Sequence, residues 1–392
     1  MVKMKLEKSS KDPELYFYFT TKGQKLWMYR HKYKDSTGNR KEKKKSSFKT
    51  EKAALQALLE VKAATLRGET KQVEYDHLTV AEWLDIWYDM SKKNWKESTR
   101  NLRKTIIRIH LKPAIGRFKL QELDKLTYER NFINKLEGKF KSTSISIWHN
   151  VFKIAINAAV ENEILPRNRF KKVKISSDEE VVNENYLTPA ELVTFLNDAK
   201  KHENITSYSF LMTIAFTGIR CGEAMGIQWK NIDFEKKTIK IERTRDWYGA
   251  RSPKTKNSYR TILVDESVIN QLITYKKWCK KTLFSYGKKL TNETFVFISD
   301  HGGNPLSSTT RLMKRIIERT SLHKITLHGL RHTHCTILLN RGLNVKVIAE
   351  RLGNTPHMVL EIYGHVLKEL EEESVLLFSQ SLQASGANTG AN

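Results

Sequence analysis

Cysteine is scarce in this chain of 392 residues, which contains only Cys221, Cys279 and Cys335. These three residues are far apart and lack the spacing of zinc ligands, so neither a disulfide framework nor a zinc site is expected. Long apolar runs are also missing. No segment approaches the roughly 18 apolar residues of a membrane-spanning helix, and the N-terminus lacks the apolar region of a signal peptide. We therefore expect a cytoplasmic protein with no membrane segment.

Acidic residues are also far fewer than basic ones. Lys and Arg number 69 against 43 Asp and Glu, which gives a formal net charge of +26. So large an excess destabilises a compact state by self-repulsion unless a polyanion is the working partner. Contacts from Lys and Arg to phosphates supply most non-specific nucleic-acid affinity, so DNA or RNA is the leading candidate. An anionic membrane surface is the alternative, but no basic amphipathic helix of the interfacial type stands out.

The length and the patterning predict three domains and a tail, because a chain of this size is too long for one compact core. Residues 1–70 are expected to form a small basic module, residues 76–175 an all-helical domain rich in Lys and Arg, and residues 186–382 a third domain. An exposed linker joins the second domain to the third. Residues 383–392 are small and polar, and we expect them to be disordered.

The first module is predicted to contain three strands and a helix. Apolar and alternating residues favour strands at 15–19 and 25–33, a turn at 35–39 leads to a strand at 40–48, and Thr50 caps the helix. Aromatic and basic side chains are interleaved here, as in a nucleic-acid-binding face. The candidate DNA contacts are Trp27, Tyr29, Lys41, Lys43, Lys44 and Lys45. The alternative is a solvated basic edge that prevents strand aggregation.

Two capping boxes mark where helices begin, at Thr79-Val-Ala-Glu82 and at Thr188-Pro-Ala-Glu191. Between them, helical patterns cover residues 98–109, 123–136 and 142–163. Pro113 and Gly116 are expected to separate the first two of these helices, and Pro166 to end the last.

Two arginines in the third domain are candidates for binding a phosphate. An arginine stays protonated and offers a planar fork that fits phosphate oxygens. Arg220 lies three residues before Glu223, so in a helix the carboxylate can orient its guanidinium. His328 and Arg331 are also three apart and share a helix face. For Arg220 and Glu223 alone, an ordinary surface ion pair explains the spacing equally well.

A basic hairpin tip lies between strands predicted at 239–243 and 259–264. A lysine there can enter a groove of a nucleic acid and protonate the oxygen that leaves when a phosphodiester is cut. Lys254 and Lys256 compete for this role, and spacing does not choose between them. A solvated lysine that only touches phosphate is the alternative.

A tyrosine beside two arginine forks is a candidate nucleophile toward a phosphodiester. Tyr363 follows the apolar Val359, Leu360 and Ile362 on a short helical segment. Taken alone, it is better explained as a half-buried core residue. The histidines around Arg331 do not suggest a metal, because carboxylates and cysteines at ligand spacing are missing.

Three short sequence motifs follow one another in the third domain. They are Thr217-Gly-Ile-Arg-Cys-Gly-Glu223, then His328-Gly-Leu-Arg-His332, then Leu352-Gly353 through Tyr363. In this order they resemble the tyrosine recombinases, the integrases of phages and transposons. The first module is similar to the arm-binding domain of integrases from Gram-positive mobile elements, and the helical domain is similar to their core-binding domain. The resemblance implies a multidomain fold in which a small α+β arm module and an all-α core-binding domain precede a mainly α catalytic domain with a small β-sheet.

The resemblance also implies roles for single residues. Arg220 and Arg331 would grip the scissile phosphate, with Glu223 supporting them and His328 assisting proton transfer. Lys254, with Lys256 as the second candidate, would protonate the departing 5′ oxygen. Tyr363 would attack phosphorus and form a 3′-phosphotyrosyl bond, so that religation needs no cofactor and no metal.

One position departs from the family pattern. After Leu352-Gly353 the family usually has His, sometimes Trp, whereas this chain has Asn354. Asparagine donates a hydrogen bond to a phosphate oxygen but carries no charge and shuttles no proton. His357, one helical turn further on, is a candidate substitute. We expect reduced but real activity.

The partners implied are double-stranded DNA attachment sites and three further copies of the chain, which form a homotetramer on synapsed DNA. An excision factor and a host DNA-bending protein are further candidates. The segment from Leu367 to Leu382 is expected either to dock on a neighbouring subunit or to fold back on its own domain. Two other functions stay open: a DNA-binding regulator with a catalytically weak or dead fold, and a relaxing enzyme like the type IB topoisomerases.

Overall fold

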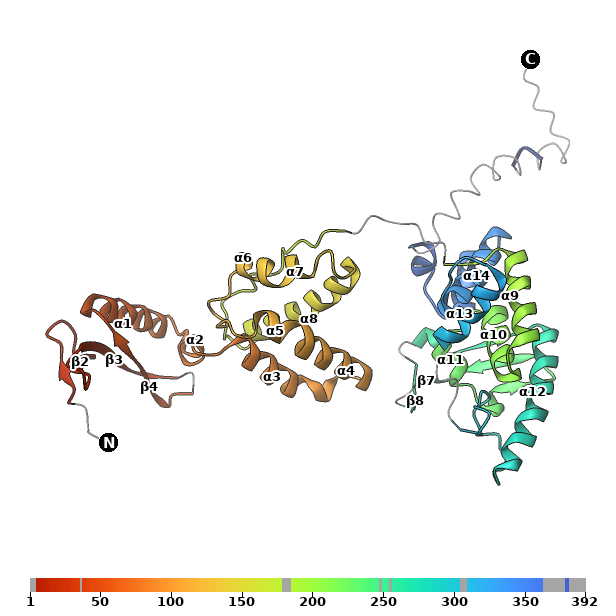
Figure 1. The fold of residues 1–392 in the computed structure, drawn as a ribbon, viewed down its shortest axis with the longest axis horizontal. Coiled ribbons are helices and arrows are strands. Elements are labelled where there is room, and N and C mark those ends of the chain that lie inside the picture. Colours follow the sequence, from red (N-terminus) through yellow and green to blue (C-terminus); the bar gives the residue numbers. More distant parts are fainter. Residues whose placement is uncertain are drawn as a thin grey trace, which may run out of the picture. The chain divides into compact units, whose positions relative to one another are not determined.

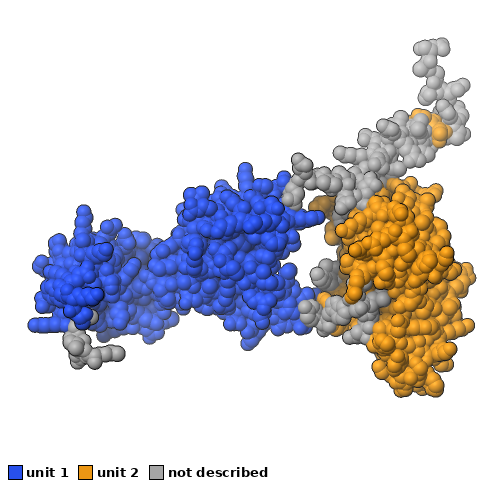
Figure 2. All heavy atoms as spheres, viewed as in Figure 1, with its two compact units in different colours: residues 1–180 blue, residues 181–392 orange. Residues whose placement is uncertain are grey.

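The computed structural model describes residues 5–35, 37–177, 185–246, 249–253, 256–303, 309–361 and 378–380, with the side chain of Lys256 left out. The chain divides into two compact units, residues 1–180 and 181–392, coloured blue and orange in Figure 2. The first unit contains two separate hydrophobic clusters, one within residues 15–58 and one within 78–170. The predicted division into three domains and a tail stays a proposal, since the two units do not test each boundary.

The N-terminal module is a four-stranded antiparallel sheet with one helix packed on it (Figure 1). Its elements are β1 (Glu7–Lys8), β2 (Leu15–Phe19), β3 (Lys25–Lys34), β4 (Arg40–Phe48) and α1 (Glu51–Leu66). The three longer strands are as predicted, and Thr50 caps α1 by accepting from the amide of Ala53. The two-residue strand β1 was not predicted, because so short an edge strand has no readable alternation.

The pairing of β3 with β4 separates the basic module into two faces. Tyr29, His31 and Tyr33 lie opposite Lys45, Lys43 and Lys41, whereas Arg30 lies opposite Lys44. Directly opposed residues of an antiparallel pair project from the same side of the sheet. The first set faces α1, because Tyr29 packs in the cluster with Ala54 and Leu58 and His31 lies 3.0 Å from the Thr65 hydroxyl. Arg30 and Lys44 therefore belong to the opposite, open face.

This pairing corrects the expected role of Tyr29. Its side chain is only 1% exposed, so it stabilises the module and does not reach nucleic acid. Trp27 packs partly against the same cluster. Lys41 and Lys43 form ion pairs with Glu74 and Asp76 respectively, at the helix-covered side. Strand alternation alone did not reveal which of the two faces α1 would cover.

The second part of the first unit is helical. Its helices are α2 (Thr70–Glu74), α3 (Val80–Ser91), α4 (Glu97–Ile106), α5 (Lys112–Ile115), α6 (Lys125–Tyr128), α7 (Asn134–Leu136) and α8 (Ser142–Glu161). The capping box at Thr79 and Glu82 is formed as predicted. Trp83, Trp87, Phe132 and Phe152 are buried between the helices.

The first two predicted helices are separated after Gly116, as expected, but the first helical path continues past Pro113, beyond the predicted end at residue 109. A π-helical turn, Ile107–Leu111, connects α4 directly to α5, which has Pro113 in its first turn. In a regular α-helix the proline ring would clash with the carbonyl four residues earlier. That carbonyl belongs to Ile109, which lies in the wider π-helical turn. The clash is therefore avoided, and the chain stays helical up to Gly116.

The second unit is mainly helical with small sheets, as predicted. Its helices are α9 (Pro189–His202), α10 (Ile205–Thr217), α11 (Cys221–Met225), α12 (Glu266–Ser285), α13 (Thr309–Thr320), α14 (Leu327–Asn340) and α15 (Val345–Leu352). Helix α10 is buried along most of its length and packs against α9, α12 and α14 (Figure 1). A sheet of β5 (Ile232–Asp233), β6 (Thr238–Ile241) and β9 (Arg260–Leu263) lies beside them, and β7 (Thr244–Asp246) pairs with β8 (Gly249–Arg251).

The predicted hairpin is present, since β6 and β9 pair antiparallel and enclose the basic tip. Lys254, Tyr363 and most of the segment 367–382 lie outside the described residues, as does the side chain of Lys256. Within the described ranges, no helix combines the length and apolarity needed to cross a bilayer.

Candidate active site

Gly218, whose backbone adopts the left-handed conformation, places Arg220 at the start of α11. Helix α10 ends at Gly218, whose φ of 67° is a conformation that favours glycine. A side chain there is excluded as well, because a Cβ would lie 2.5 Å from Leu352 and 2.7 Å from His334. The chain therefore turns sharply after α10, and Arg220 becomes the N-cap of α11.

Arg220 is bound between its own helix and the end of α15. Its Nη1 donates to Glu223 Oε1 at 2.9 Å, as predicted, while its backbone amide donates to Oε2 at 3.1 Å. Its Nη2 donates to Oδ1 of Asn354 and, at 3.5 Å, to the carbonyl of Gly353. Asn354 thus occupies a position in direct contact with the first arginine.

The carboxylate of Glu223 is buried and serves two arginines. Its Oε2 also accepts from Arg260 Nη2 at 2.9 Å. Burial acts to raise the pKa of Glu223, but the hydrogen bond and charge of Arg260 and the charge of Arg220 outweigh it, so the pKa lies below its ordinary value. Glu223 is therefore ionised at neutral pH.

Arg331 is the second buried arginine. It lies on α14, is 3% exposed, and donates from Nη1 to the carbonyl of Gly218 at 2.8 Å and from Nη2 to that of Leu352 at 2.9 Å. His328 lies one turn before it and reaches the surface. Partial desolvation lowers the pKa of His328, and the positive charges of Arg331 and Arg220 lower it further. The ring is thus neutral at pH 7 and close to both arginines.

The C-terminal end of α15 is the common anchor of three arginines. Its carbonyls at residues 351, 352 and 353 accept from Arg260, Arg331 and Arg220 respectively. The last carbonyls of a helix have no partner within it and carry partial negative charge, so they suit guanidinium donors. The helix end therefore holds guanidinium groups from α11, α14 and β9 in one place.

Arg351 and His334 attach the C-terminal end of α15 to other parts of the second unit. Arg351 donates from Nη1 to the carbonyl of Leu263 at 3.0 Å, from Nη2 to that of Phe216 at 3.1 Å, and from Nε to His334 Nε2 at 3.0 Å. His334 in turn donates from Nδ1 to the carbonyl of Ala215 at 3.0 Å. Burial and the charge of Arg351 lower the pKa of His334 to about 4, so this histidine is neutral and has a structural role.

A cavity of about 460 Å³ opens beside these residues. Its lining includes Asn257, Arg260, Lys346, Gly353 and Asn354. The structure does not bring His357 into the cluster, because its side chain is 87% exposed and lies 3.8 Å from Glu361. Among the predicted residues, Arg220, Glu223, His328, Arg331 and Asn354 are thus brought together. The positions of Lys254, Tyr363 and the Lys256 side chain stay predictions.

The sequence did not single out Arg260 or Arg351. Arg260 begins the returning strand of the hairpin, and Arg351 precedes the Leu352-Gly353 helix end. Arg260 contacts Glu223, 37 residues away, and Arg351 contacts Leu263 and Phe216, 88 and 135 residues away, so no local spacing pointed to these contacts.

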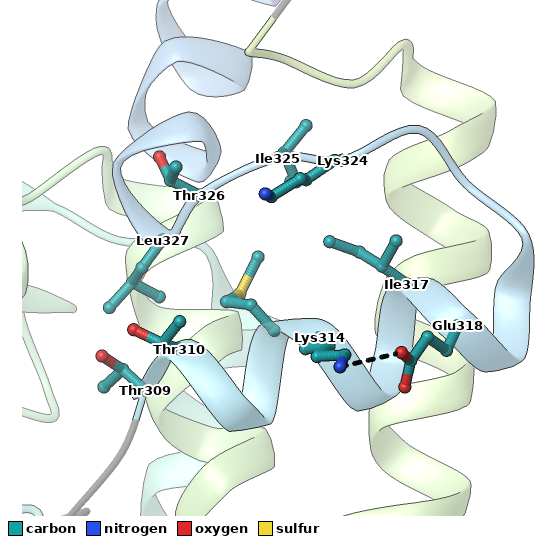
Figure 3. Close-up of a pocket in the computed structure, with 10 residues that line it drawn as sticks. Thr309, Thr310, Lys314, Ile317, Glu318, Lys324, Ile325, Thr326 and Leu327 are labelled. Carbon is teal, nitrogen blue, oxygen red and sulfur yellow. Dashed lines mark ion pairs between the residues drawn. The ribbon is translucent and has the colours of Figure 1, made fainter. Parts of the chain in front are cut away.

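Another cavity lies between α13 and the segment before α14 (Figure 3). Its lining is largely apolar, with Met313, Ile317 and Ile325, and its Lys314 forms an ion pair with Glu318. None of the clustered arginines lines it. Its lining includes Leu327, the first residue of α14, the helix that also carries His328 and Arg331.

Family models match most of the chain. Residues 16–65 match an arm DNA-binding domain, residues 79–137 a phage integrase N-terminal SAM-like domain, and residues 185–369 the phage integrase family. The last range includes the arginine cluster and Tyr363.

Relatives and solved structures agree with these matches. The chain is 26% identical over 329 residues to a protein of Caldanaerobacter subterraneus named tyrosine recombinase XerC-like, a match that covers 77% of this chain and 83% of that one. It is also 26% identical to the ICEBs1 integrase of Bacillus subtilis, over 72% of this chain and 77% of that one. The fold resembles that of the Tn1549 transposon integrase in complex with a circular intermediate DNA, with 21% identity, a TM-score of 0.62, and 72% and 94% of the two chains covered. It also resembles a lambda integrase tetramer bound to a Holliday junction, with 17% identity, a TM-score of 0.56, and 88% and 97% covered.

A basic arm module, a SAM-like helical domain and a helical domain with clustered arginines together define a class of DNA-handling enzymes. The chain belongs to the phage integrase family, the tyrosine recombinases.

Proposed function

We propose that this chain is an integrase that cuts and rejoins DNA at specific sites to insert, and also to excise, a mobile genetic element. The observation that carries this proposal is the convergence of Arg220 and Arg331 at the end of α15, shortly before Tyr363 in the sequence. Two guanidinium groups at one point offer a binding place for a phosphodiester.

The proposed reaction is a transfer of phosphorus between two oxygens. The Tyr363 hydroxyl gives its proton to a base, for which the neutral His328 is the candidate, attacks the scissile phosphorus, and forms a 3′-phosphotyrosyl bond while the bond to the 5′ oxygen breaks. A lysine of the hairpin tip, Lys254 or Lys256, gives a proton to that leaving oxygen. Arg220 and Arg331 stabilise the charge that develops on the phosphoryl oxygens, the term that is usually largest in such sites.

The neutral His328 is suited to move a proton or to donate one hydrogen bond to the phosphate. The phosphotyrosyl bond retains the energy of the broken phosphodiester, so the 5′ hydroxyl of another strand can attack it and restore the backbone. The reaction therefore balances without a nucleotide, an oxidant or a metal ion.

A nicked duplex tests this proposal. The protein is incubated with a duplex that carries the junction between element and chromosome, nicked close to the expected crossover point so that the short cleaved fragment diffuses away. We expect an adduct that resists denaturation and is joined through a 3′ phosphate, with a free 5′ hydroxyl on the released fragment. Tight binding without an adduct would favour a DNA-binding regulator with an inactive site.

The two alternative functions are less well supported. The relatives are named integrases and recombinases, and a relaxing enzyme acting without site choice has no need of a second DNA-binding module such as that matched at residues 16–65. By analogy with the lambda integrase tetramer on a Holliday junction, we propose that four protomers act on two synapsed duplexes. An excision factor and a host bending protein belong to the same proposal.

The open face of the arm module is the proposed DNA-contacting side. Replacing Lys44 with alanine is expected to weaken arm-site binding and to reduce the salt dependence of affinity by about one phosphate contact. The matched control is Lys43→Ala, because Lys43 projects from the opposite face and pairs with Asp76. Affinity measured over a range of salt concentrations distinguishes the two variants. Equal losses for both would show that the open face is not the contacting side.

Asn354 is expected to limit the rate of cleavage. Its Oδ1 accepts a hydrogen bond from Arg220, so the side chain borders the proposed phosphate position but carries no charge. Replacing it with histidine should raise the cleavage rate on the nicked duplex several-fold. His357→Ala, which changes a solvent-exposed side chain, should leave the rate unchanged. An unchanged rate for Asn354→His would mean that this position does not limit catalysis.

A further inference from the structure

Arg260 is an arginine to which no role in the reaction has been assigned, and it contacts both anchors of Arg220. Its side chain is 8% exposed. Nη2 donates to Glu223 at 2.9 Å, Nε to the carbonyl of Arg351 at 2.6 Å, and Nη1 to the carbonyl of Ser258 at 3.0 Å. These donors are directed at protein groups, so Arg260 is not placed to grip a substrate.

The charges of this cluster explain why a second arginine is needed. Glu223 is 3% exposed and ionised, and it lies 2.9 Å from a nitrogen of Arg220 and 2.9 Å from a nitrogen of Arg260. With Arg220 alone, the buried carboxylate would cancel the charge that is to face the phosphate. With Arg260 present, the three groups together keep one positive charge, and a buried carboxylate is favoured only when it is fully paired.

The geometry adds a second contribution. Arg260 also packs against the other anchor of Arg220, the backbone at Gly353. A Cβ on Gly353 would lie 2.7 Å from Arg260 Nη1 and 2.9 Å from the carbonyl of Asn257, and the φ of 66° favours glycine in any case. The guanidinium of Arg260 therefore fills the space beneath residues 353 and 354, where Arg220 is bound.

We propose that Arg260 is a positioning residue that neutralises Glu223 and supports the end of α15, so that the charge of Arg220 is directed at the scissile phosphate. This inference rests on the proposed function, since it assumes that Arg220 binds a phosphate. It goes beyond that function because it assigns a task to a residue of the returning hairpin strand that does not touch the DNA.

The test uses the full chain and compares Arg260→Met with Arg260→Met combined with Glu223→Gln. The matched control is Arg319→Met, because Arg319 pairs with the carboxylates Asp198 and Glu203 elsewhere in the same unit. Three quantities are measured: the cleavage rate on the nicked duplex, the affinity for intact duplex, and the affinity for orthophosphate by calorimetry. Thermal unfolding checks that each variant is folded.

We expect Arg260→Met to slow cleavage about 100-fold, in line with losing one electrostatic contributor. Its duplex affinity should change less than about twofold, because many other phosphate contacts remain. Adding Glu223→Gln should restore at least about tenfold of the lost rate, because it removes the carboxylate that is no longer neutralised. Orthophosphate affinity should fall and recover in parallel, and Arg319→Met should resemble the wild type throughout.

Two results would overturn the proposal: cleavage by Arg260→Met at the rate of the Arg319→Met control, or a double variant no faster than Arg260→Met. If Arg260→Met does not fold, Arg260→Lys decides, since it keeps the charge. It should cleave within about tenfold of the wild type, and a folded but inactive Arg260→Lys would count against neutralisation. A wild type that forms no adduct contradicts the proposed function, whereas orthophosphate binding still tests the arrangement of Arg260, Glu223 and Arg220.

Discussion

Replacing Tyr363 with phenylalanine is expected to abolish covalent attachment to DNA and to lower recombination by at least about 10⁴-fold. The substitution removes one oxygen, the proposed nucleophile, and keeps the aromatic ring. Arg220, Arg331 and the two other DNA-binding modules are unchanged, so duplex affinity should stay within about twofold of the wild type. The measurement is the yield of denaturation-resistant adduct, with binding measured on the same preparation.

Tyr259→Phe is the matched control for this prediction. Tyr259 is 52% exposed and lines the cavity beside Asn354, so it is the described tyrosine best placed to be mistaken for the nucleophile. It should form adduct at the wild-type level. If Tyr259→Phe lost the adduct and Tyr363→Phe kept it, the nucleophile would have been wrongly assigned.

Replacing Arg331 with lysine is expected to slow cleavage by about 10²- to 10³-fold. The guanidinium of Arg331 donates to the carbonyls of Gly218 and Leu352 from two different nitrogens. Its planar positive charge also faces the proposed phosphate position. Lysine keeps the charge as a compact ammonium that cannot reproduce this forked geometry. One buried carbonyl would then lose its donor, which costs about 1–3 kcal/mol of unfolding free energy.

The control for Arg331→Lys is Arg315→Lys, a substitution of the same kind at an ion pair with Glu203, where the arginine side chain is 53% exposed. Cleavage on the nicked duplex and chemical unfolding are measured for both variants. The control should match the wild type in both. Normal cleavage by Arg331→Lys would mean that the fork at this position only supports the fold.

Local signals in the sequence were sufficient for much of the fold. Both capping boxes form as predicted, because each is a contact between residues three apart. The contact between Arg220 and Glu223 is of the same kind. The left-handed ends of α10 and α15 occur at Gly218 and Gly353, where the sequence ends each helical pattern.

Features that depend on distant parts of the chain were not predictable in this way. Alternation in β3 separates two faces, but only the packing of α1 decides that Tyr29 is buried. The first helix of the second module was predicted to end at residue 109, but a π-helical turn carries it on to Ile115, an extension that local propensity does not reveal. Arg260 finds its acceptors on α11 and α15, so its role emerges only when β9 lies beside both.

The most direct test of the account is to digest the protein–DNA adduct formed on the nicked duplex and to identify the modified peptide by mass spectrometry. We expect a nucleotide attached through its 3′ phosphate to Tyr363, on a peptide from the segment after Arg351. Attachment to any other residue, or through a 5′ phosphate, would contradict it.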